Sequence, residues 1–144
     1  MQELDELKLD YFHLDCFDGD ENKVSIDIQA IKAFSKTPID LHAISARSEF
    51  FFDFAERLQV KQLTLQYENI ADELRIPENK SFKFGLAVSN ETPIDLLEKY
   101  VDKLDYILLM TTTPGKSGGK FEKTSFDRIR KCKALYPNVP IYVD

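Results

Sequence analysis

Short apolar segments typical of β-strands alternate along this chain with amphipathic segments typical of α-helices. Strand-like stretches occupy residues 11–15, 38–42, 61–66, 82–88, 105–110 and 140–144, and helix-like stretches occupy residues 1–9, 25–34, 48–58, 68–76, 92–104 and 124–135. Strands separated by helices of about ten to fifteen residues are typical of right-handed βαβ units in a parallel sheet. The alternation therefore predicts an α/β fold with about six parallel strands.

The length of 144 residues suits one domain, and the sequence contains no linker or low-complexity segment. A closed eight-stranded barrel usually needs about 200 residues or more. Two architectures remain open on this ground: a smaller open sheet, or a barrel whose two ends are missing.

Local signals refine the expected elements. Ser48 is a candidate N-cap, and Thr92 followed by Pro93 predicts the start of another helix. Thr124 or Ser125 is expected to cap the helix over 124–135. The continuous apolar run at 105–110 predicts a strand that is buried on both faces.

The net charge of −6 argues against a nucleic-acid-binding surface and against binding that depends on an anionic membrane. Cys16 and Cys132 form no metal-binding motif, so we expect reduced thiols. We find no leader segment and no apolar run of about 18 residues. These observations predict a cytoplasmic protein.

Polar residues that can bind a metal stand at the ends of three predicted strands. They are His13 and Asp15, His42, and Asp144. Side chains two residues apart on a strand share a face, so His13 and Asp15 are expected to point the same way. Because ligand sites of parallel α/β folds lie at the carboxyl ends of the strands, the four residues predict one site for Zn²⁺, Mn²⁺ or Fe²⁺.

A glycine-containing loop, "TTTPGKSGGKFEKTS" at residues 111–125, follows the strand at 105–110. Its Gly115, Gly118 and Gly119 would let backbone N–H groups approach an anion, and a helix N-terminus follows. The embedded "GKS" does not make a nucleotide-binding P-loop, because Met110 stands where that motif needs its first glycine. A surface loop without a ligand is the alternative.

Four motifs, in order, resemble those of the ribulose-phosphate 3-epimerase family. "HLDCFDG" (13–19) is similar to the family's H-x-D-x-M-D-G, and "DLHAI" (40–44) is similar to D-x-H-x-M. "LMTTTPGKSGGKF" (109–121) is similar to the sixth-strand motif V-M-x-x-x-P-G-F-G-G-Q-x-F, and "YVD" (142–144) is similar to the seventh. The resemblance covers essentially the entire chain.

The resemblance implies a (β/α)₈ barrel, of which residues 1–144 would form a single partial domain. It also implies metal-dependent interconversion of D-ribulose 5-phosphate and D-xylulose 5-phosphate. Asp15 and Asp144 would be the acid/base pair and would ligate the metal with His13 and His42. Met110 would pack against the reaction intermediate, and Gly115, Gly118 and Gly119 would contact the phosphate of the ketose.

The chain departs from the family pattern at several points. Nothing corresponds to the family's first and eighth strands, and Phe17, Ile44 and Gln66 replace two methionines and a histidine. Lys116, Ser117 and Gly119 replace Phe, Gly and Gln in the loop.

Three interpretations stay open. The first is an active epimerase, including one that acts on a six-carbon ketose phosphate. The second is a non-catalytic fragment or degenerate member that retains metal or ligand binding. The third is an unrelated flavodoxin-like domain, which leaves the motif order unexplained. A homo-oligomer is compatible with the first two.

Overall fold

A computed structural model of the protein describes residues 9–70, 73–111 and 124–144. Six strands form one sheet in the order β1-β2-β3-β4-β5-β6, and every neighbouring pair is parallel. The strands are β1 (Phe12–Phe17), β2 (Ile39–Ile44), β3 (Gln62–Gln66), β4 (Lys83–Val88), β5 (Tyr106–Leu109) and β6 (Ile141–Val143). The predicted parallel α/β fold is confirmed, and the arrangement is that of an incomplete (β/α)₈ barrel.

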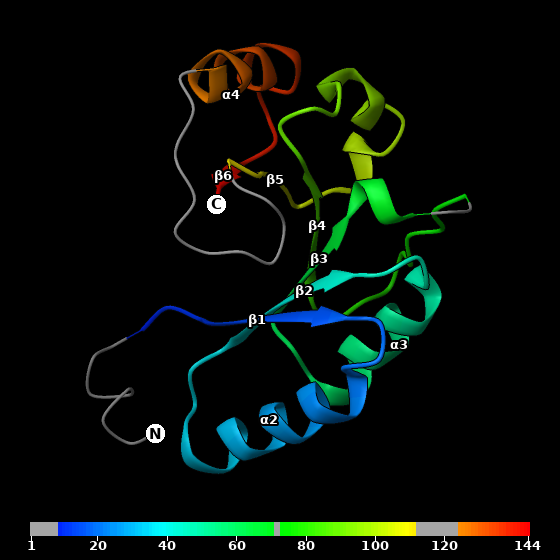
Figure 1. Ribbon diagram of the computed structural model, residues 1–144, viewed down its shortest axis with the longest axis vertical. Helices are drawn as coiled ribbons and strands as arrows, with labels where there is room; N and C mark the ends of the chain where they lie inside the picture. Colours follow the sequence, from blue (N-terminus) through cyan, green and yellow to red (C-terminus); the bar gives the residue numbers. More distant parts are fainter. Residues whose placement is uncertain (1–8, 71–72, 112–123) are drawn as a thin grey trace.

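Helices connect these strands. They are α2 (Glu21–Phe34), α3 (Ser48–Leu58) and α4 (Thr124–Leu135), with short 3₁₀ helices η1 (Tyr67–Asn69), η2 (Ile94–Leu97) and η3 (Val101–Lys103). In Figure 1, α2 and α3 lie beside the β1–β3 part of the sheet, and α4 lies at the β6 end. No helix in the described ranges is long and apolar enough to span a membrane. Of the helix expected at 1–9, residues 1–8 lie outside the described residues, and Leu9 is not helical.

One face of the sheet is apolar and packs against helices. Its fully buried residues cluster with those of α2 and α3; they include Leu41, Leu63, Leu65, Phe84, Leu86 and Ile107 from strands and Ile28, Phe51 and Phe54 from helices. The strand β5 is buried along its length, as expected. Cys16 and Cys132 are free and buried in this core.

The prediction of an α-helix over 92–104 is wrong, because the structure has the two short 3₁₀ helices η2 and η3 in this range. The backbone hydrogen bonds of this segment join residues that are three apart in the sequence, such as the bond from Glu98 N–H to the carbonyl of Asp95. Ile94 and Leu97 are the buried residues of η2, and this spacing of three suits a 3₁₀ helix, in which such side chains are aligned. Pro93 has an extended ψ of 130° and precedes η2 rather than beginning an α-helix.

The helix predicted over 68–76 is also wrong in its described part. It is reduced to the three residues of η1, and no helix is assigned from Glu73 to Ile76. Leu74 and Ile76 are both buried. Their spacing of two suits extended backbone, which places alternate side chains on one side.

The predicted N-cap of α3 also differs from the structure. Ser48 is the first helical residue, and Arg47 occupies the N-cap without a side-chain cap. Ser45 organises this turn instead, because its hydroxyl accepts a hydrogen bond from Arg47 N–H at 3.0 Å and donates one to Asp18 at 2.5 Å. The helix predicted over 124–135 is present as α4, and the two predicted caps, Thr124 and Ser125, both lie within it.

Candidate metal centre

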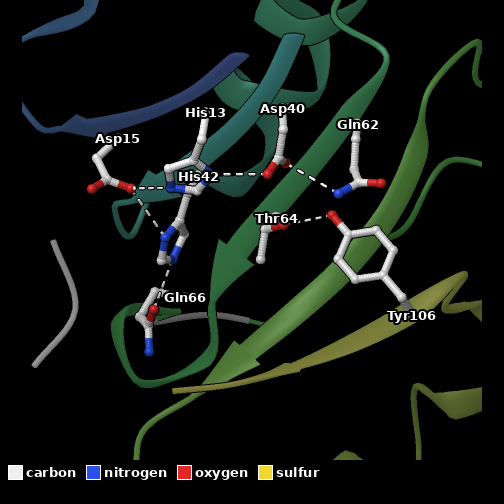
Figure 2. A network of polar contacts seen from close by, with 8 residues as sticks. All are labelled: His13, Asp15, Asp40, His42, Gln62, Thr64, Gln66 and Tyr106. Atoms are coloured by element: carbon white, nitrogen blue, oxygen red, sulfur yellow. Dashed lines mark hydrogen bonds and ion pairs between the residues drawn. The ribbon is translucent and has the colours of Figure 1, made fainter. Parts of the chain in front are cut away.

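The second face of the sheet carries polar side chains along β1, β2 and β3, and β1 and β2 continue two residues beyond Asp15 and His42, which the sequence placed at the strand ends. Parallel pairing sets Asp15 beside His42 and His13 beside Asp40. The same alternation brings Gln62, Thr64 and Gln66 of β3 to this face. Figure 2 shows the resulting network, in which His13 and His42 both turn toward Asp15.

Three of the four predicted metal ligands come together. One ligand atom from each of His13, Asp15 and His42 lies within 4.8 Å of the others. Asp15 Oδ1 is 3.0 Å from His13 Nε2 and 3.3 Å from His42 Nδ1. Two imidazole nitrogens and one carboxylate oxygen are a suitable donor set for Zn²⁺, Mn²⁺ or Fe²⁺.

The geometry of His42 tests whether a cation fits. Its side chain is fully buried, and Nε2 lies 2.8 Å from Gln66 Oε1. Its Nδ1 is also buried and makes no hydrogen bond within the described part of the chain. If Nε2 carries the proton, then Nδ1 presents a lone pair toward the Asp15 carboxylate. Two facing acceptors are unfavourable unless a cation or a proton lies between them, so the residues fit a metal ion.

His13 has a different environment. Its ring is 44% exposed, its Nδ1 lies 2.8 Å from Asp40 Oδ2, and its Nε2 faces Asp15. Hydrogen bonds to Asp15 and then Asp40 raise the pKa of His13 to about 10. The hydrogen bond from His13, and after it the neighbouring ring of His42, hold the pKa of the Asp15 carboxyl well below its usual range. The contact with Asp40 leaves His13 Nε2 as the nitrogen that faces the cluster, an arrangement common among metal-binding histidines.

The other predicted site residues in the described part of the chain do not join the cluster of His13, Asp15 and His42. Asp144 follows β6 and lines a cavity with His13, but its carboxylate is not in the three-residue group. Its backbone extends the β5–β6 pairing, because Thr111 N–H donates to its carbonyl at 2.7 Å. Met110 is buried on the site face with Ala87 and Leu108. Gly115, Gly118 and Gly119 lie outside the described residues.

The cavity beside His13 shows residues that the sequence did not reveal. Its volume is about 230 Å³, and it is lined by His13, Asp40, Gln62, Thr64, Tyr106, Leu108, Tyr142, Val143 and Asp144. Asp40 could have been identified, because it stands two residues before His42 and so shares its face. Tyr106 could not, since its hydroxyl reaches Thr64 Oγ1 at 2.5 Å across an intervening strand.

A parallel sheet whose strands follow one another in chain order, with histidines and aspartates gathered on one face, is that of a protein of the (β/α)-barrel class. The family model described as the ribulose-phosphate 3 epimerase family matches residues 1–144. The chain belongs to the ribulose-phosphate 3-epimerase family.

Individual proteins similar to this chain carry the same family name, at low sequence identity. The ribulose-phosphate 3-epimerase of Bacillus subtilis is 23% identical over 133 residues, which cover 88% of this chain and 61% of that protein. The ribulose-phosphate 3-epimerase of Methanocaldococcus jannaschii is 27% identical over 143 residues, which cover 94% of this chain and 60% of that protein. The chain thus spans about three fifths of the length of these curated relatives.

Proposed function

We propose that this chain carries the metal-binding and proton-transfer part of a ribulose-phosphate 3-epimerase. The reaction would be the interconversion of D-ribulose 5-phosphate and D-xylulose 5-phosphate at C3. The observation that carries the proposal is the buried Nδ1 of His42, which faces Asp15 without a hydrogen bond to the described chain. Family membership supplies the reaction class.

His13, Asp15 and His42 would hold one divalent ion, Zn²⁺, Mn²⁺ or Fe²⁺, and Asp144 would complete the set. When bound, such an ion stabilises negative charge that develops on the substrate oxygens beside the reacting carbon. His13 would contribute Nε2 and His42 would contribute Nδ1, because their other ring nitrogens already contact Asp40 and Gln66.

Asp15 and Asp144 would move the proton. Epimerisation removes a proton from one face of C3 and returns one to the other, so it needs a carrier on each side. Asp15 lies in β1 and Asp144 directly follows β6, the two edge strands of the described sheet, which supports placing substrate between them. Met110 would pack against the substrate, and Gly115, Gly118 and Gly119 would contact its phosphate.

Family membership also supports a proposal for the domain extent, cellular location and binding partners of the chain. The chain would form a single partial barrel domain over residues 1–144 in the cytoplasm, and it would act on a phosphorylated ketose. Its net charge of −6 disfavours partnership with nucleic acid. A homo-oligomer is compatible with this setting.

Solvent-deuterium exchange at C3 of D-ribulose 5-phosphate tests the proposal, with the whole chain loaded with metal. We expect slow exchange, and we expect Asp15→Asn and Asp144→Asn each to abolish epimerisation because each removes one proton carrier. Exchange can persist in one variant, since the other face still loses its proton. Unchanged turnover in both variants would overturn the assignment of the carriers.

A second candidate is a family member that binds metal without catalysis. The observation favouring it is that β1 and β6 each pair with a single strand in the described part of the chain, so the substrate face is open on two sides. Stoichiometric metal binding together with no detectable exchange at C3 would select this candidate.

A further inference from the structure

The side-chain amide of Gln66 lies between His42 and Glu68 (Figure 2 shows the His42 side). Gln66 Oε1 is 2.8 Å from His42 Nε2, and Gln66 Nε2 is 2.5 Å from Glu68 Oε1. Gln66 is 1% exposed and His42 is fully buried, so water competes little with these contacts. The amide therefore connects a candidate metal ligand to a carboxylate that lies farther from the site.

The orientation of this amide follows from what each partner can do. A carboxylate accepts hydrogen bonds and donates none, so the NH₂ group of Gln66 must face Glu68. Its carbonyl oxygen then faces His42 and can only accept. The proton of a neutral His42 ring is thereby fixed on Nε2, and the lone pair of Nδ1 points toward Asp15.

Glu68 is itself held in place. Its carboxylate accepts hydrogen bonds from Ser89 N–H at 3.2 Å and from Ser89 Oγ at 2.9 Å. Arg128 of α4 donates at 2.8 Å to the carbonyl of Ser89. The group that orients Gln66 is thus fixed by the segment after β4 and, through it, by α4.

We propose that Gln66, oriented by Glu68, is a positioning residue that sets the tautomer of His42 and so keeps Nδ1 available to a divalent cation. The inference rests on the metal centre proposed above and assigns to Gln66 and Glu68 a role at that centre. An amide does not change its protonation, so it offers His42 a carbonyl acceptor throughout the pH range in which the protein is folded.

Histidine-selective ¹⁵N NMR tests the tautomer directly, because the chain contains two histidines and the spectrum holds two imidazoles. In the metal-free wild type we expect the proton of His42 on Nε2, in slow exchange with water. Gln66→Met keeps a similar shape but removes the acceptor. We expect this variant to speed that exchange and to lower Zn²⁺ affinity about 10–100-fold, as for other groups that orient metal ligands.

Two variants serve as controls. Gln66→Glu loses the NH₂ group that donates to Glu68 but retains an acceptor toward His42, so it should keep the Nε2 proton of His42. Gln62→Met removes the other glutamine of β3, which donates to Asp40 rather than to His42. It should leave the Nε2 proton of His42 unchanged. If Gln66→Met fails to fold, Glu68→Met, which removes the acceptor of the Gln66 amide, provides the test and should speed exchange of that proton.

The outcomes separate this inference from the proposed function. A wild type that binds no Zn²⁺ but shows a slowly exchanging Nε2 proton, lost in Gln66→Met, refutes the metal centre and supports the tautomer assignment. An Nε2 without a proton in the metal-free wild type overturns the inference. So does wild-type Zn²⁺ affinity with an unchanged Nε2 proton in Gln66→Met, or an unchanged proton in Glu68→Met where that variant is the test.

Discussion

At the scale of single residues, the two histidines of this chain differ in what surrounds them. His13 is partly exposed between the carboxylates of Asp15 and Asp40, whereas His42 is buried against the neutral amide of Gln66. Carboxylates favour a protonated ring, and an amide carbonyl favours a particular tautomer. We therefore expect a proton on His13 to compete with metal binding.

Metal binding should depend on pH for this reason. The pKa of His13 is raised to about 10, so the metal-free protein carries a proton there below that pH, and a metal ion must displace it. Apparent Zn²⁺ affinity should rise by up to about tenfold per pH unit between about pH 7 and pH 9, with release of roughly one proton per ion. Calorimetry in buffers of different ionisation enthalpy measures the proton count.

Asp40→Asn is the matched control, because it removes one of the two carboxylates that raise the pKa of His13. Fewer protons should be released at about pH 9 in this variant. An affinity that does not change with pH over this range would contradict the competition.

Removing a metal ligand should lower Zn²⁺ affinity more than removing a group that orients a ligand. His13→Ala and His42→Ala each delete one of four proposed ligands, so Zn²⁺ affinity should fall by well over the roughly 10–100-fold expected for orienting groups. Competition against a chromophoric chelator measures both constants. If either variant kept wild-type affinity, that histidine would not be a ligand.

At the scale of elements, β4 and β5 pack closely because the Tyr106 ring of β5 lies directly against Gly85 of β4. A Cβ at Gly85 would lie 2.2 Å from Cε2 of Tyr106, so the ring occupies the space that any other residue would fill. The Tyr106 hydroxyl also donates to the carbonyl of Leu63 at 3.0 Å. This packing fixes the ring in the lining of the cavity beside His13.

Gly85→Ala should therefore destabilise the fold by about 1–3 kcal/mol, the usual cost of overpacking. Urea denaturation measures the change in the free energy of unfolding. In a Tyr106→Leu background the added methyl group has room, so the same substitution should cost less than about 1 kcal/mol. Equal costs in the two backgrounds would show that the ring is not the obstacle.

The sequence predicted the strands better than the connections between them. Strand positions follow from apolar runs, and the parallel order brings His13, Asp15 and His42 together without further information. The prediction of an α-helix after Thr92 was wrong because it relied on the residue types at its first positions. Burial of Ile94 and Leu97, which are three residues apart, favours a 3₁₀ helix instead. The contact of Gln66 with His42 needed the register of β2 and β3 and the placement of Glu68, which no local pattern specifies.

At the scale of the whole molecule, the site belongs to the folded sheet. Its three closest members come from β1 and β2, which are far apart in the unfolded chain and adjacent in the sheet. A ligand that binds the folded state alone stabilises that state. Metal binding should therefore be visible in the stability of the entire chain.

Zn²⁺ at about 100 times its dissociation constant should add about 2.7 kcal/mol of stability. For a chain of this size that corresponds to a rise in Tm of roughly 5–10 °C. Differential scanning calorimetry measures the shift, and the double variant His13→Ala/His42→Ala provides the control. A similar shift in the control would assign the stabilisation to metal bound elsewhere.

The most direct measurement is anomalous diffraction at the zinc edge from crystals of the whole chain grown with Zn²⁺. The account predicts one strong peak between β1 and β2. It should lie about 2.0–2.1 Å from His13 Nε2 and His42 Nδ1 and about 2.0–2.2 Å from an oxygen of Asp15. A fully occupied zinc ion at another place with this site empty, or His42 bound through Nε2, would contradict the account.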